Sequence, residues 1–171
     1  MTTSVLGYEA SFQPTAVDEI ELKVLPAATI LQTTADGQYF RNSNNLFRRL
    51  FRYIKKNEVA MTVPVVARME PGTMQFFVGT NDLAKALRDE GDVRIESLPA
   101  RTVASIGGRG GYSKSNFNEA KRKLEVWLAT HQQLAPIGEA YAVYWSGPFV
   151  PWFLKRYEVH IPVTTESGSA E

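Results

Sequence analysis

Two ionisable side chains near the end of the chain, Glu158 and His160, have a spacing that could support chemistry. They stand two residues apart in an alternating apolar segment, so the period of two in a strand places both on one face. His160 could ligate iron, with Glu158 holding its ring, although a plain role in the sheet or in a pocket wall is the reading that we favour. Apolar neighbours would raise the pKa of Glu158, which would suit recognition of a cation or, less readily, general acid–base catalysis.

A run of basic residues forms the second group of candidates. No acidic residue occurs between Arg41 and Asn57, and helical spacing places Arg48 and Arg52 one turn apart on the same face. Guanidinium groups arranged in this way could pair with carboxylates or phosphates of a ligand. The simpler interpretation, which we favour, is a solvated helix face.

Large aromatic residues form the third group. Phe149, Trp152 and Phe153 follow Pro148 and flank Pro151, which predicts a loop. Large apolar side chains on a loop either line a ligand cleft or cover the core, and the sequence leaves both alternatives open. The thioether of Met61 is a fourth candidate contact, although methionine in an apolar strand is usually packing.

Other patterns argue against several kinds of site. The glycines at 107, 108, 110 and 111 lack the lysine and hydroxyl residue of a P-loop, and they predict a flexible loop before a helix. Arg109 and the backbone amides of that loop could still meet an anion. The chain has two histidines and no cysteine, so we expect no zinc site, no disulfide and no cysteine nucleophile.

The elements that must position these residues follow from periodicity. Helical spacing predicts one helix over residues 43–56, capped by Ser43 or Asn44, and a second over residues 116–132, capped by Asn116 with Glu119. Leu50 in the first helix and Leu124 in the second should be buried, as should Met61. Alternating apolar residues predict strands over residues 59–66, 74–78, 141–145 and 157–163.

The chain also contains an internal repeat. Residues 20–30 resemble residues 93–103 at an offset of 73, and both copies alternate, break at Leu-Pro-Ala and resume. Pro26 and Pro99 should therefore occupy equivalent bends, because proline removes a donor from the strand ladder. The sequence predicts an α+β fold of two β-α-β-β halves, forming a curved antiparallel sheet or distorted barrel with two helices packed outside. We expect one domain over residues 18–164, with loosely ordered tails at 1–17 and 165–171.

Composition narrows the class of protein. Nineteen basic and 18 acidic residues nearly balance in the 171-residue chain, so we expect no nucleic-acid partner. We expect no signal peptide in the first residues, and no window approaches the roughly 20 apolar residues of a membrane span. We expect a soluble, cytoplasmic protein, and its oligomeric state stays open.

Two segments resemble a known family. Val59-Ala60-Met61-Thr62-Val63-Pro64-Val65 and the run from Pro148 to Pro162 resemble the motifs of the SOUL heme-binding proteins, in the same order. The resemblance covers roughly Ile20 to Val163. It implies a fold that binds tetrapyrroles or other flat apolar molecules. The fold of this family is similar to that of effector-binding domains of the gyrase-inhibitor type, in which an acid of the last strand lies in the ligand groove. Glu158 occupies that position.

The resemblance also marks a departure. Some heme-binding members carry a histidine on the first strand where this chain has Val24, so axial ligation of that kind is excluded. We expect non-covalent binding of heme or another porphyrin, weakly or without histidine ligation, with Arg48 and Arg52 near the propionates. The alternatives are a binding module for lipophilic or cationic effectors anchored at Glu158, and an enzyme acting on such a ligand.

Overall fold

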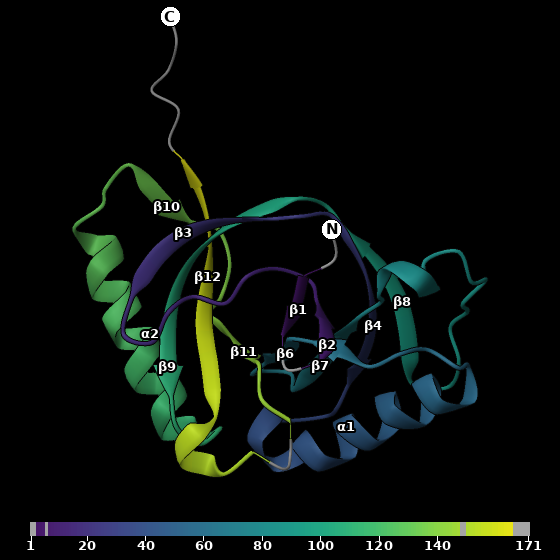
Figure 1. The fold of residues 1–171 in the computed structure, drawn as a ribbon. Coiled ribbons are helices and arrows are strands. Elements are labelled where there is room, and N and C mark those ends of the chain that lie inside the picture. The colour runs from purple at the N-terminus through teal and green to yellow at the C-terminus, as the bar shows by residue number, and fades with distance from the viewer. Residues whose placement is uncertain (1–2, 6, 148–149, 166–171) are drawn as a thin grey trace, which may run out of the picture.

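A computed structural model describes residues 3–5, 7–147 and 150–165 (Figure 1). Its main element is a strongly curved sheet. The first half contributes β3 (Ile20–Leu25), β4 (Ala28–Thr34), α1 (Tyr39–Lys56), β5 (Thr62–Val63), β6 (Val65–Arg68) and β7 (Thr73–Phe77). The second contributes β8 (Val93–Leu98), β9 (Arg101–Arg109), α2 (Lys114–Ala129), β10 (Leu134–Pro136), β11 (Tyr141–Tyr144) and β12 (Arg156–Thr165). β1 (Thr3–Val5) and β2 (Tyr8–Ala10) precede them, and η1 (Thr80–Asp82) and η2 (Trp152–Leu154) are short 3₁₀ helices.

The main sheet has the order β3-β9-β12-β11-β6-β7-β4-β8, and β10 adds to β12. All its described pairings are antiparallel, and the sheet curves strongly without closing. β1 and β2 form a small second sheet with β5, in which β2 and β5 run parallel. The α+β class and the curved antiparallel sheet predicted from the sequence are confirmed.

The repeat appears as a symmetric strand register. β3 pairs with β9 and β4 pairs with β8, and in both ladders the two residue numbers of each pair add up to 126. Ile20 faces Ile106, and the repeat offset of 73 carries that pair onto Val93 and Thr33, which also face each other. The guanidinium of Arg101 donates to the carbonyls of both Pro26 and Pro99, at 3.2 and 3.4 Å. The two prolines therefore occupy equivalent bends, as predicted.

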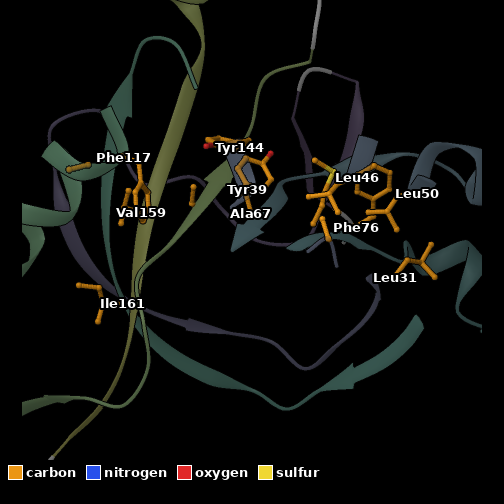
Figure 2. Close-up of a cluster of buried hydrophobic side chains, with 14 of the residues drawn as sticks. Leu31, Tyr39, Leu46, Leu50, Ala67, Phe76, Phe117, Tyr144, Val159 and Ile161 are labelled. Carbon is orange, nitrogen blue, oxygen red and sulfur yellow. The ribbon is translucent and has the colours of Figure 1, made fainter. Parts of the chain in front are cut away.

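The convex face of the sheet carries both helices and the larger apolar core. Figure 2 shows Phe117 of α2 with Val159 and Ile161, and Leu46 and Leu50 of α1 with Leu31 and Phe76. Tyr39, Tyr144 and Ala67 lie between these two groups. The predicted burial of Leu50 and Leu124 is confirmed, whereas Met61 is only half-buried because it lies at the edge of this core.

Both helices begin earlier than the sequence predicted. α1 starts at Tyr39 rather than residue 43, because the buried Tyr39 ring packs against the core and extends the helix by one turn. α2 starts at Lys114, and Ser113 is its cap: the Ser113 hydroxyl accepts from the backbone N–H of Asn116 at 3.1 Å. The predicted caps at residues 43–44 and 116 were therefore wrong.

The concave face is filled by the segment before β3. Figure 1 shows β1 and β2 within the curve of the sheet. Ala10 and Phe12 pack with the smaller apolar cluster on this face, and Thr15 is buried. Residues 8–17, which the sequence assigned to a loose tail, thus pack against the sheet, because they cover apolar and polar groups that would otherwise be open to water. Of the second predicted tail, residues 166–171 lie outside the described part of the chain.

Candidate functional site

Glu158 lies at the centre of a buried polar network on the concave face. Its side chain is fully buried, five groups donate hydrogen bonds of 3.0 Å or less to it, and the Thr15 hydroxyl lies 3.3 Å from Oε1. The Oε1 atom accepts from Lys23 Nζ at 2.7 Å, His160 Nε2 at 2.8 Å and Ser105 Oγ at 2.9 Å. The Oε2 atom accepts from Trp145 Nε1 at 2.5 Å and the backbone N–H of Thr15 at 3.0 Å.

The strand register explains why these residues meet. β12 lies between β9 and β11, so that His160 faces Ser105 on one side and Tyr141 on the other. Glu158 faces Gly107, and alternation sends Glu158 and His160 to the same concave side. The expectation that these two side chains share one face therefore agrees with the structure.

The network holds Glu158 in its charged form. Burial has the largest single influence on the pKa of Glu158 and would raise it. The hydrogen bond from His160 and the charge of Lys23 together outweigh burial, and the pKa falls below its ordinary value of 4.5. The raised pKa predicted from the apolar sequence context was wrong, because apolar residues surround the network while polar groups contact the carboxylate itself. A permanently ionised, fully bonded carboxylate suits cation recognition better than proton transfer.

His160 is neutral and both of its ring nitrogens are engaged. Burial lowers the pKa of His160, and the nearby Glu158 carboxylate opposes this effect only in part. Nε2 therefore carries the proton that it donates to Glu158, which leaves Nδ1 to accept from the Tyr141 hydroxyl at 3.3 Å. With both nitrogens occupied, the ring presents no lone pair to an iron atom in this arrangement.

A cation from the chain itself already occupies the neighbourhood of Glu158. The Lys23 side chain is 9% exposed, and its ammonium lies 5.3 Å from the centre of the Phe12 ring. Phe12 in turn packs edge-on against Trp145 and Phe77, with ring centres 5.4 and 5.9 Å away. An ammonium between a buried carboxylate and an aromatic ring is the arrangement by which proteins recognise organic cations.

Sequence reasoning missed Thr15, Lys23 and Ser105 as members of this network. The signal for Lys23 was available, because β3 places it on the same side as the apolar Leu25, where a lysine needs a buried partner. The signal for Thr15 was absent, since nothing local indicates that residues 8–17 fold back over β9 and β12.

The glycine-rich segment is divided between a strand and the predicted loop, because Gly110 and Gly111 lie in the connection between β9 and α2. Gly107 and Gly108 belong to β9, where the absence of side chains makes room for neighbours. A Cβ atom on Gly107 would lie 2.2 Å from the carbonyl oxygen of Ala16, and one on Gly108 would lie 2.5 Å from the Tyr157 ring. Gly107 therefore admits the segment that covers Glu158, whereas Gly108 admits the Tyr157 ring of β12.

The predicted aromatic loop is exposed at the surface. Trp152 is 70% exposed and Phe153 is 54% exposed, in η2, and Leu154 beside them is also exposed. The two rings contact each other edge-on. Of the two alternatives left open by the sequence, plain cover of the core is therefore wrong for Trp152 and Phe153. Phe149 lies outside the described residues.

The remaining candidates do not join the Glu158 network. Arg48 and Arg52 lie on the exposed face of α1, where the exposed ring of Phe51 stacks on Phe47. Val24 is 76% exposed on the edge strand β3, away from the concave side. The structure therefore offers a buried charged network, exposed aromatic side chains on η2 and exposed arginines on α1.

Among the described residues, no three histidine, aspartate or glutamate side chains lie close enough together to hold a metal ion. In the same part of the chain, neither helix is long and apolar enough to cross a membrane.

The sequence profile of the SOUL heme-binding protein family matches residues 7–162, nearly the whole chain. The chain belongs to the SOUL family. The matched range includes the segment before β3, in agreement with its packing on the concave face. No curated protein matches the chain in sequence.

Solved structures share the fold at low sequence identity. The C-terminal domain of EcmrR has a TM-score of 0.67 at 16% identity, covering 86% of this chain and 98% of that domain. In the EcmrR–DNA complex, the chain corresponds to only 57% of EcmrR. SAV2435 bound to tetraphenylphosphonium has a TM-score of 0.52 at 12% identity, covering 85% of this chain and 94% of that one. A hydrolase from Listeria innocua has a TM-score of 0.57 at 12% identity, covering 88% and 94%.

Proposed function

We propose that this SOUL family chain binds heme or a related tetrapyrrole non-covalently, without a histidine ligand to the iron. The observation that carries the proposal is the family match over residues 7–162. Exposed side chains on two elements suit such a ligand, and on η2 Trp152 and Phe153 offer their rings to a flat macrocycle. Arg48 and Arg52 offer guanidinium groups to its propionates.

Two positions support binding of heme without a histidine ligand. Val24 cannot bind iron, and both nitrogens of His160 are engaged with Glu158 and Tyr141. Binding would therefore rest on contact with the macrocycle and on charge, which favours modest affinity.

A heme titration followed by the Soret band tests this proposal. We expect the double variant Arg48→Ala/Arg52→Ala to lose about 1–3 kcal/mol of binding free energy, because the guanidinium groups form charge-assisted hydrogen bonds. Lys121→Ala/Lys123→Ala removes the same charge from α2 and serves as the matched control. Equal losses in both double variants would show that only the overall charge matters, and an unchanged affinity in the α1 variant would refute the arginine roles.

A second variant tests whether His160 ligates the iron of the heme. His160→Gln should leave the Soret band largely unchanged, because the ring does not reach the ligand. A lost or strongly shifted band in a variant that remains folded would make His160 the axial ligand.

A specific observation favours a second candidate function, recognition of a lipophilic cation at Glu158. Lys23 already holds an ammonium between the Glu158 carboxylate and the Phe12 ring, and a structure of the same fold is bound to tetraphenylphosphonium. Calorimetric titration with tetraphenylphosphonium tests it: binding that disappears in Glu158→Gln supports this function. A Soret band together with no cation binding favours the first.

A further inference from the structure

We propose that residues 8–17 form a plug segment, which opens as a unit separately from the main sheet and uncovers the Glu158 network. In the closed state described here, Phe12 and Lys23 take the places of the aromatic and cationic parts of a ligand. The site is thus complete but occupied by the chain itself.

The plug segment fills the concave side with side chains of the right kind. The ring centre of Phe12 lies 5.4 Å from that of Trp145 and 5.8 Å from that of His160. Thr15 is buried, and its backbone N–H donates directly to Glu158. Lys23 Nζ donates to the carbonyl oxygen of Gln13 as well as to Glu158, both at 2.7 Å, and so links the segment to the carboxylate.

Two glycines leave room for the plug segment, Gly107 in β9 and Gly79 between β7 and η1. A Cβ atom on Gly107 would collide with the backbone of Thr15 and Ala16, at 2.7 and 2.2 Å from their carbonyl oxygens. A Cβ atom on Gly79 would lie 2.6 Å from the Glu9 carboxylate, which accepts from the backbone N–H of Thr80. The plug segment therefore packs closely at defined positions.

The attachment is nevertheless light in comparison with the strands. Among the described residues, β2 pairs with β5 over only two residue pairs, and Ser11 adds one bond to the Val63 carbonyl. At the other end Val17 makes a single bridge with Gly107. The neighbouring β12 pairs with β9 over seven residue pairs. Opening the plug segment would break few backbone bonds, and segments of that kind open locally below the global unfolding free energy.

The chain also provides a pivot for such an opening. Asp18, which joins the plug segment to β3, has a φ of 65°, a left-handed conformation that aspartate tolerates better than most residues. Its N–H donates to the Gly107 carbonyl, so the turn is fixed to β9 while the segment before it lies across the network.

Native-state hydrogen exchange tests the plug directly, without any ligand. In the wild type, we expect the amides of Ser11 and Thr15 to exchange at least about tenfold faster than those of Val159 and Ile161 in β12. Gly107→Ala should accelerate residues 8–17 further and leave β12 unchanged. Gly147→Ala is the matched control, because a Cβ atom there would meet no atom within 4 Å.

A second variant keeps the test decisive if Gly107→Ala disturbs β9. Phe12→Ala removes the ring from the apolar cluster on the concave face without changing a residue of the main sheet, and it should loosen the same residues. If residues 8–17 exchange at the rate of β12 in the wild type, or if both variants accelerate the whole sheet equally, the plug is overturned.

Titration with tetraphenylphosphonium then tests what the plug controls, and this arm alone rests on the second candidate function. We expect Phe12→Ala to bind the cation about tenfold more tightly than the wild type, since no ring has to be displaced first. Equal affinity in both proteins would overturn the gating role. Local opening without cation binding to either protein would leave the plug in place and refute the cation as ligand.

Discussion

At the scale of single residues, the chain keeps one charge pair in its interior by surrounding the carboxylate with donors. Glu158 is buried, yet its two oxygens accept from an ammonium, an imidazole, an indole, a hydroxyl and a backbone amide. A buried carboxylate with so many partners remains ionised, because each donor stabilises the charged form. The neighbouring His160 remains neutral for the complementary reason, since its burial penalises a positive charge.

The neutral His160 predicts a dependence of stability on pH. The pKa of His160 is lowered in the folded chain, so below its ordinary value of 6.5 the unfolded chain binds a proton that the folded chain does not. The free energy of unfolding should therefore fall as pH drops below about 6.5, by up to about 1.4 kcal/mol per pH unit. Denaturant titrations at pH 7.5 and 5.5 measure this change, and His160→Gln should lose that part of the slope. The same slope in both proteins would contradict the assignment.

The residue scale also shows how far the sequence could predict the site. The alternation of the last strand was enough to pair Glu158 with His160. It did not predict Lys23, Ser105 or Thr15, because they come from three other parts of the chain and only the sheet order brings them together. The direction of the pKa shift at Glu158 depended on those partners, so it could not be derived from the neighbouring residues.

At the scale of elements, periodicity predicted that both helices exist and failed to predict where they begin. Apolar spacing identifies Leu46, Leu50 and Leu124 as the buried stripes, and they are buried. The first turn of α1 depends on the packing of Tyr39, a tertiary contact that no local pattern reveals. The glycines of β9 show the same limit, because glycine-rich sequence favours a loop until a packed neighbour requires the missing side chain.

The cap of α2 gives a direct test at this scale. Ser113→Ala removes the hydroxyl that accepts from Asn116 N–H, and it should cost about 0.5–2 kcal/mol of unfolding free energy. Ser43→Ala is the matched control, because Ser43 lies inside α1 and alanine is favoured there. Thermal or denaturant unfolding compares the two, and an equal effect of both substitutions would refute the cap.

At the scale of the whole molecule, the two halves share one sheet and one core. β6 of the first half pairs with β11 of the second, and the larger apolar cluster includes residues of both helices. Neither half buries its apolar face alone, so the described chain should unfold in one cooperative step.

Matched truncations in the two helices test that cooperativity. Leu46→Ala in α1 and Leu124→Ala in α2 should each cost about 2–5 kcal/mol, because both side chains are fully buried. Both variants should shift a single transition, whether it is followed by fluorescence or by circular dichroism. Two separate transitions, each affected by only one substitution, would show that the halves fold independently.

The symmetric register has one more consequence, for the way in which the two copies have diverged. Gln32 and Gln75 face each other as Ser105 and His160 do, and residue 32 lies one repeat before residue 105. The first copy thus carries an uncharged amide pair, joined by a hydrogen bond of 2.6 Å, where the second carries its histidine. The counterpart of Gly107 is Thr34, whose side chain would fill the space that Ala16 occupies in the second copy. The duplicated strands therefore carry two equivalent positions, and the one occupied by glycine is the one against which the plug segment packs.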